Sequence, residues 1–172
     1  MLLLAHLGIG LGLAWLLAGK ASGRIDYRLV LLGAILPDLI DKPLGVALGL
    51  DTRIWGHTFL FLFALLALSL VPSLRVLRLA GFGVATHLLL DEMWVEPAVA
   101  LYPLQGSAFP PTEFHPEVWI DALLHNPVVQ VGEITGTIIL LAFAWRHGLF
   151  SWKALRAFLA QGALSRASES QP

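Results

Sequence analysis

The sequence predicts an all-α membrane protein, a polytopic bundle of about five transmembrane helices followed by a C-terminal amphipathic helix. Hydrophobic residues make up 57% of the 172 residues and charged residues only 13%, whereas a soluble domain carries about a quarter charged residues. The mean hydropathy is +0.76. The apolar residues come in long blocks, which is typical of transmembrane helices.

The first apolar block covers residues 2–18 and is interrupted only by His6. We interpret it as a retained helix rather than a cleaved signal peptide, because Lys20 and Arg24 follow the apolar run and no basic segment precedes it. Glycines at positions 8, 10 and 12 would let another helix approach this one closely.

The second apolar block, residues 29–40, runs into the sequence Leu-Pro-Asp-Leu-Ile-Asp-Lys-Pro, which contains Asp38 and Asp41. The proline and the glycines that follow predict a loop or a short re-entrant piece as far as residue 51. A third helix is predicted over residues 54–71, with His57 near its start.

A fourth helix is predicted over residues 74–100, and it carries His87 and Asp91 in its second half. The following segment, residues 101–127, is rich in proline and contains several acidic residues and two histidines. We expect it to form a long loop.

A fifth helix is predicted over residues 128–149, with Glu133 near its start. Residues 151–163 have the pattern of a basic amphipathic helix that lies on the membrane surface. The Ser/Glu/Gln-rich end of the chain is expected to be disordered. The chain is thus divided into a helical bundle, residues 1–150, and a C-terminal segment, residues 151–172.

The distribution of basic residues predicts the orientation of the bundle, because Lys and Arg favour the cytoplasmic side. With five spans, three basic segments fall on the same side of the membrane. They contain Lys20, Arg24, Arg28, Arg75, Arg78, Arg146, Lys153, Arg156 and Arg166. The N-terminus is then outside and the C-terminus inside.

This topology brings ionisable side chains from all five predicted helices to the outer half of the membrane. They are His6, Asp38, Asp41, His57, His87, Asp91 and Glu133. Residues three or four apart share a helix face, so Asp38 pairs with Asp41 and His87 pairs with Asp91. Because charge is costly to bury in an apolar run, we interpret these residues as one buried polar centre that binds metal.

The residue types define the ion that such a centre would hold. The chain has no cysteine, so the ligands are imidazole and carboxylate, which suit zinc and also manganese or iron. Zinc lowers the pKa of a water ligand to about 7, and Glu133 is a candidate base for its proton. A shared ion requires the Asp38 carboxylate and the His87 ring to lie within about 8 Å of each other.

The same residues allow other interpretations. Asp38 and Asp41 could be helix caps or ion-pair partners of Lys42 or Arg53. A cation or proton pathway would also use intramembrane carboxylates and histidines, although it needs polar groups in both leaflets. In a non-enzymatic membrane scaffold, the polar residues would hold the helices together.

Four motifs carry a resemblance to a known family. They are His6 in the first helix, Leu36-Pro37-Asp38 with Asp41, Gly56-His57-Thr58, and His87-x-x-x-Asp91. In this order they resemble the inner-membrane metal-dependent hydrolases typified by YdjM, over residues 1–149. The order is also similar, more distantly, to that of bacterial zinc phospholipase C and the related zinc nucleases.

The resemblance implies a multi-pass protein of the inner membrane with metal-dependent hydrolase activity, and the second likeness suggests a phosphoester or lipid substrate at the outer interface. We expect Asp38, His57, His87 and Asp91 to be the core ligands, and His6 and Asp41 to complete or support them. Arg53 is a candidate for holding a substrate phosphate. The bilayer is the expected partner. Nucleic acid is not, because no basic stripe with interleaved aromatic residues is present.

Overall fold

The computed structural model describes residues 1–19, 25–106, 108–109, 111, 115, 117–162 and 164, and the described part of the chain is all helical apart from one isolated bridge. The long helices are α1 (Leu3–Ala18), α2 (Tyr27–Leu48), α3 (Phe59–Leu68), α4 (Leu77–Leu90) and α7 (Pro127–Arg146). The short elements are η2 (Pro72–Leu74), η3 (Met93–Val95), α5 (Pro97–Ala100), α6 (Glu117–His125) and α8 (Trp152–Gln161). Lys20, Arg24, Arg166 and the C-terminal residues 165–172, on which part of the sequence predictions rest, lie outside the described residues.

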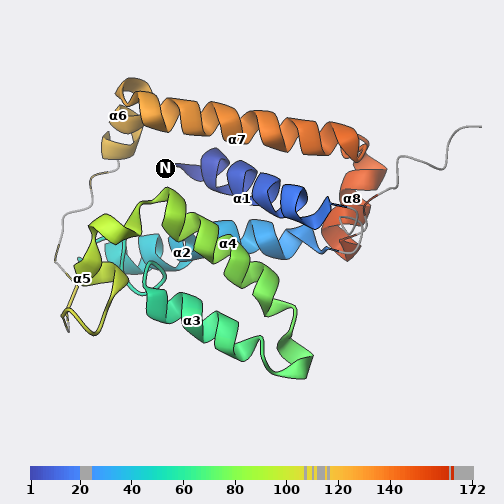
Figure 1. Cartoon of the computed structure of the whole chain (residues 1–172). Helices are drawn as coiled ribbons and strands as arrows, with labels where there is room; N and C mark the ends of the chain where they lie inside the picture. Colours follow the sequence, from blue (N-terminus) through green and yellow to red (C-terminus); the bar gives the residue numbers. More distant parts are fainter. Residues whose placement is uncertain are drawn as a thin grey trace, which may run out of the picture.

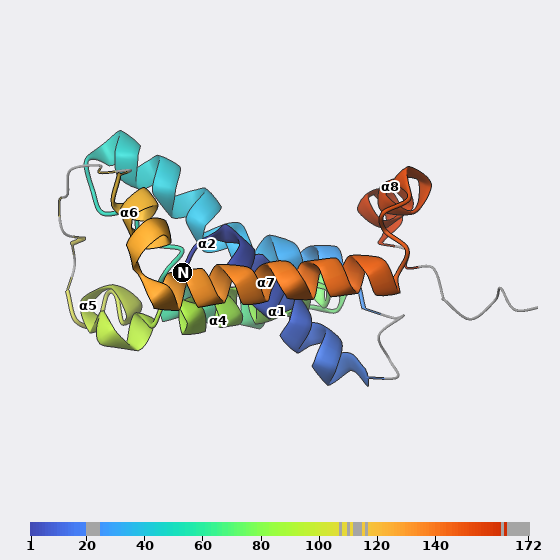
Figure 2. The same ribbon diagram turned by 90° about the horizontal axis from the view of Figure 1, so that it is seen from above.

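The long helices form an elongated bundle in which successive helices run in opposite directions (Figure 1). Helix α1 lies between α7 and the α2–α4 pair, and the most extensive contacts are those of α2 with α4 and of α1 with α7. The N-terminus, α5 and α6 are at one end, and α8 is at the other (Figures 1 and 2). The alternating directions agree with the order of the five predicted helices.

Several predicted helix ends were wrong, and one predicted loop contains a helix. Helix α2 continues through Pro43 and ends at Leu48, followed by the cap residue Gly49, whose φ of 63° is left-handed. Helix α3 begins only at Phe59, because the segment before it turns to hydrogen-bond to Asp41. Helix α4 ends at Leu90, since Glu92 has a φ of 52° and breaks the predicted helix into α4, η3 and α5. The predicted long loop contains helix α6.

The predicted number of spans remains a prediction. Within the described residues, α7 is the one helix with both the length and the apolar composition of a membrane span. Helices α1, α3 and α4 are apolar but have only 10–17 residues, and α2 has 22 residues but carries Asp38, Asp41 and Lys42.

The predicted amphipathic segment at the C-terminus forms α8. Its Phe158 packs in an apolar cluster with Tyr27 and Phe143 at the end of the bundle. The guanidinium of Arg28 donates to the Leu159 carbonyl, and it also hydrogen-bonds to Asp26, the residue that caps α2. The hydrogen bonds from Arg28 lower the pKa of Asp26 below its ordinary value. Arg28 therefore joins α8 to the start of α2.

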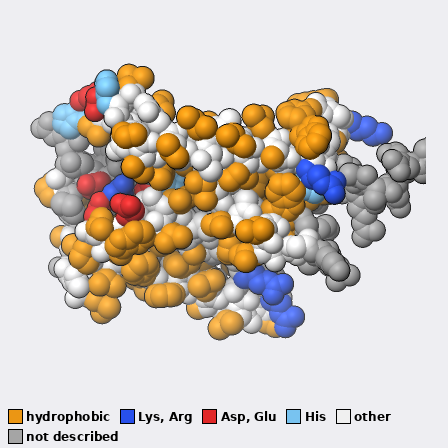
Figure 3. Space-filling view, turned by 45° about the horizontal axis from the view of Figure 1, so that its top comes forward, with side chains coloured by type: hydrophobic (Ala, Val, Ile, Leu, Met, Phe, Trp, Pro, Cys, Tyr) orange, Lys and Arg blue, Asp and Glu red, His pale blue; other side chains and the backbone are white. Residues whose placement is uncertain are grey.

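On the face shown in Figure 3, acidic side chains lie at the end of the bundle that carries α5 and α6, and most Lys and Arg side chains lie at the opposite end. This asymmetry supports the predicted separation of the acidic centre from the basic loops.

Glycines set the close contact between α1 and α7. A β-carbon at Gly136 would overlap the backbone of Leu4, and one at Gly8 would overlap the backbone of Gly136. Two helices whose backbones touch need a residue without a side chain, such as glycine, at the point of contact.

Gly136→Ala should therefore lower the stability of the bundle by about 1–3 kcal/mol, because the helices must move apart. Thermal unfolding in detergent would measure the loss. Gly132→Ala on the same helix is the control, since its β-carbon would come too close only to the end of the flexible Met1 side chain, which can move away, and would meet Ala5 at an ordinary contact distance. Equal melting temperatures for the two variants would contradict this packing.

Candidate metal centre

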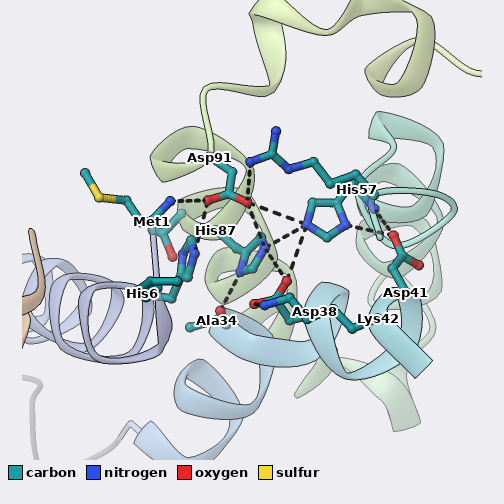
Figure 4. Close-up of polar contacts among 12 residues, drawn as sticks. Met1, His6, Ala34, Asp38, Asp41, Lys42, His57, His87 and Asp91 are labelled. Atoms are coloured by element: carbon teal, nitrogen blue, oxygen red, sulfur yellow. Dashed lines mark hydrogen bonds and ion pairs between the residues drawn. The ribbon is translucent and has the colours of Figure 1, made fainter. Parts of the chain in front are cut away.

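The predicted ligands meet at the end of the bundle near the N-terminus (Figure 4). His6 comes from α1, Asp38 and Asp41 from α2, His57 from the segment before α3, and His87 and Asp91 from α4 and its end. Residues that are up to 85 positions apart in the chain thus lie within one small cluster. Charge buried in an apolar bundle is least costly when it is collected in one place and paired.

The tautomer of His87 follows from its surroundings. The ring is buried, and its Nδ1 lies 2.8 Å from the carbonyl oxygen of Ala34. Because a carbonyl oxygen only accepts, Nδ1 carries the hydrogen and donates it. The lone pair of Nε2 therefore points into the cluster, which is the arrangement of a metal-binding histidine.

His57 is held in the same manner by Asp41. Its Nδ1 lies 2.7 Å from Oδ2 of Asp41. The fully buried Asp41 carboxylate also accepts hydrogen bonds from the backbone N–H groups of Ile54, Gly56 and His57, at 2.8, 2.8 and 3.1 Å. Both oxygens of Asp41 are thus occupied. The structure gives Asp41 the role of positioning His57, one of the two roles that the sequence predicted.

The two histidines face each other through their free nitrogens. His57 Nε2 and His87 Nε2 are 3.1 Å apart. Since both Nδ1 atoms carry a hydrogen, two neutral rings would direct lone pairs at one another. A cation or a proton between these nitrogens removes the repulsion.

Two carboxylate oxygens complete the arrangement. Asp38 Oδ1 lies 3.7 Å from His57 Nε2 and 3.9 Å from His87 Nε2. Asp91 Oδ2 lies at the same two distances from the same two nitrogens. The predicted proximity of Asp38 and His87 is confirmed.

These distances fit a divalent ion. Ligand atoms at about 2.0–2.1 Å from a tetrahedral zinc ion are about 3.3 Å from one another, and the separations of 3.1, 3.7 and 3.9 Å between these atoms bracket that value. Two groups of side chains have their ligand atoms within 4.8 Å of one another, His6 with His87 and Asp91, and Asp38 with His57 and His87.

His6 gives a second indication. Its ring is buried and stacks on His87, with 4.0 Å between the ring centroids. Its Nε2 lies 3.2 Å from Asp91 Oδ1, yet neither ring nitrogen has a hydrogen bond in proper geometry to the described residues. A buried polar atom without a partner is costly and requires an explanation. An ion beside His6 and Asp91 would supply a partner for Nε2, the ring nitrogen that faces Asp91.

Cations surround the cluster on its open side. Lys42 Nζ lies 2.7 Å from Asp38 Oδ2, so the ion pair considered from the sequence is present. Arg53 Nη2 is 3.5 Å from Asp91 Oδ2, and its Nη1 pairs with Glu96. The ammonium group of Met1 is 2.8 Å from Asp91 Oδ1. Asp38 thus directs one oxygen to the histidines and the other to Lys42, whereas both oxygens of Asp91 lie near a histidine as well as a cation.

A cavity of about 260 Å³ lies over these groups. Its lining includes both aspartates, Lys42, Arg53 and Met1, and α6 contributes Trp119, over which the Lys42 ammonium lies at 4.8 Å. The full lining is Met1, Leu2, Asp38, Lys42, Thr52, Arg53, Asp91, Val118, Trp119, Ala122 and Val129. The spacing of four residues between Asp38 and Lys42 could have predicted that Lys42 lies at this cavity. The sequence does not predict that α6 covers it.

Glu133 does not reach the cluster. Its carboxylate accepts hydrogen bonds from the backbone N–H groups of Leu2, Leu4 and Ala5, at 3.0–3.1 Å. It therefore satisfies the free donors at the start of α1, the helix that carries His6. The sequence interpretation of Glu133 as a base or ligand is replaced by this capping role.

Glu133→Gln is expected to retain the ion and to lower the melting temperature only moderately, because the amide keeps one acceptor for the start of α1. A capping change of this kind costs about 0.5–2 kcal/mol. Elemental analysis beside thermal unfolding would measure both quantities. Loss of the ion without any change in stability would show that Glu133 acts at the centre after all.

Comparison with known proteins assigns the chain to one family. The model of the YdjM inner membrane protein family matches residues 1–163. No curated protein and no solved structure matches the chain. The match covers nearly the whole sequence and agrees with the resemblance carried by the four motifs, so this chain belongs to the YdjM inner membrane protein family.

Proposed function

We propose that this membrane protein is a metal-dependent hydrolase that acts on a phosphoester at the membrane interface. The observation that carries the proposal is the pair of Nε2 atoms of His57 and His87, 3.1 Å apart and flanked by two carboxylates. The donors are nitrogen and oxygen, which suit zinc, manganese or iron. A divalent ion bound there supplies Lewis acidity toward a phosphoryl oxygen and toward water.

The number of ions is limited by His87. Both candidate ligand groups use this residue, and its Nδ1 is already engaged with Ala34. One nitrogen lone pair binds one ion, so the two groups hold a single ion between them. We propose one ion per chain.

The remaining side chains supply the other parts of a hydrolytic site. Lys42 and Arg53 line the cavity, where they can hold the oxygens of a phosphate group. Of Asp38 and Asp91, the carboxylate that does not bind the ion can accept the proton of the attacking water at its inward-facing oxygen. The overall reaction adds water across the phosphorus–oxygen bond and releases an alcohol.

A pathway for ions or protons fits the molecule less well. Such a pathway needs polar groups along the whole length of the bundle. The half of the bundle far from the cluster is filled by an apolar core that includes Leu11, Val30, Phe143 and Phe158.

Removal of the ion tests the proposal. Protein purified in detergent without chelator should contain about one zinc, manganese or iron ion per chain and should hydrolyse a chromogenic phosphodiester. Treatment with EDTA should remove both the ion and the activity, and adding back the ion should restore activity. Unchanged hydrolysis after complete removal of the ion would refute a metal-dependent reaction.

A further inference from the structure

The surface between α1 and α7 carries two adjoining apolar hollows. The first, of about 450 Å³, is lined by Met1, Ile9, Pro127, Val128, Val131 and Thr135, together with Gly132. The second, of about 670 Å³, lies between Ile9, Gly12, Leu16, Ile138, Ile139 and Ala142. Ile9 lines both hollows, so they adjoin at this residue, and we call the two together the α1–α7 groove.

The α1–α7 groove reaches the polar cavity. Met1 lines both the first hollow and the cavity above Asp38 and Asp91. Along α7 the lining extends from Val128 to Ala142, which corresponds to about 21 Å at 1.5 Å per residue. One leaflet of the hydrocarbon core is about 15 Å thick. The groove is therefore long enough for a whole hydrocarbon chain of a membrane lipid.

The two ends of this surface differ in chemistry. The lining of the groove is almost entirely apolar, whereas the cavity holds Lys42 and Arg53 beside the metal-binding cluster. A molecule that matches both ends has an anionic phosphate joined to a long apolar chain. A partner helix could cover the groove but would leave the cationic cavity without a ligand.

We propose that the substrate is a phospholipid whose phosphate group binds in the cavity between Lys42 and Arg53 and whose hydrocarbon chain lies in the α1–α7 groove. This inference rests on the proposed function, because it names the substrate class of the same centre. The chain enters sideways from the bilayer, and the groove aligns the phosphoester with the cluster of histidines.

Photochemical labelling tests this inference without requiring turnover. The probe is phosphatidic acid with a diazirine near the end of one acyl chain, in phosphatidylcholine vesicles that contain the full chain. Mass spectrometry should find the label concentrated on the groove residues of α1 and α7. Uniform labelling of all apolar surfaces, including α3, would overturn the inference.

A matched pair of variants tests whether labelling depends on the shape of the groove. Ala142 is exposed and lines the groove, and Ala64 is exposed on α3. Each methylene that leaves an apolar site weakens binding about fourfold, so Ala142→Phe should reduce labelling of the groove by about tenfold or more. Ala64→Phe should leave it unchanged. Equal labelling in both variants would count against a chain in the groove.

Hydrolysis measurements separate this inference from the proposed function. For alkyl phosphodiesters of increasing chain length, kcat/KM should rise with length in the wild-type protein and should stop rising in Ala142→Phe. Cleavage of all chain lengths with equal kcat/KM would overturn the inference and leave the hydrolase intact. Labelling of the groove without cleavage of any phosphoester would support lipid binding in the groove and refute the hydrolase.

Discussion

His87→Ala should abolish ion binding and hydrolysis together. The Nε2 atom of His87 is the one ligand atom that both candidate ligand groups share, so its loss removes the atom that joins the two groups around one ion. Loss of the ion removes several kcal/mol of transition-state stabilisation, which corresponds to a fall in kcat/KM of about a thousandfold or more. The ion content measured on the same sample should fall in parallel.

The control for His87→Ala is Glu92→Gln. Glu92 directly follows Asp91 in the chain, but it is exposed and is not a member of either ligand group. This variant should keep its full ion content and activity. A His87→Ala protein that remains folded, as judged by its helical circular dichroism, and still binds a full equivalent of ion would remove the physical basis of the centre.

Asp41→Ala should cause the largest loss of stability among the substitutions in the cluster. The change leaves three buried backbone N–H groups without an acceptor and frees the ring of His57. Each unsatisfied group costs about 1–3 kcal/mol. Thermal unfolding in detergent should therefore show a large fall in melting temperature, or the protein should fail to accumulate.

Asp41→Asn separates positioning from ligation. The amide retains one acceptor oxygen, so part of the turn at residues 54–57 should survive, while the orientation of the His57 ring is weakened. Loss of such an orienting contact lowers ion affinity about 10–100-fold. If Asp41 instead bound the ion directly, Asp41→Asn would eliminate the ion at nearly unchanged stability, and that outcome would contradict the positioning role.

The sequence predicted the helices better than their ends. Long apolar blocks locate α1, α2, α4 and α7 because hydrophobic composition is a local property that can be counted along the chain. The start of α3 could not be predicted, since it depends on backbone hydrogen bonds to Asp41, more than ten residues away. The break after Leu90 depends on the left-handed conformation of Glu92, and a glutamate in the sequence does not predict that conformation.

Which residues form the cluster was largely predictable from the sequence, but the role of each residue was not. Ionisable residues inside apolar helices must find partners, so the convergence of His6, Asp38, His57, His87 and Asp91 follows from cost alone. Asp41 and Glu133 have the same chemistry as Asp38 and Asp91. Their roles differ because each lies against free backbone N–H groups, which only the folded chain reveals.

The packing of α1 against α7 also affects the order in which the helices can come together during synthesis of the chain. Asp38, His57 and His87 are synthesised early and can meet while the ribosome is still adding residues. Helix α1 emerges first, yet the carboxylate that fixes its first turn belongs to Glu133 on the last long helix. Contacts between distant parts of a chain form late. The hydrogen bonds that complete the start of α1, the helix that carries His6, therefore form only after α7 has been made.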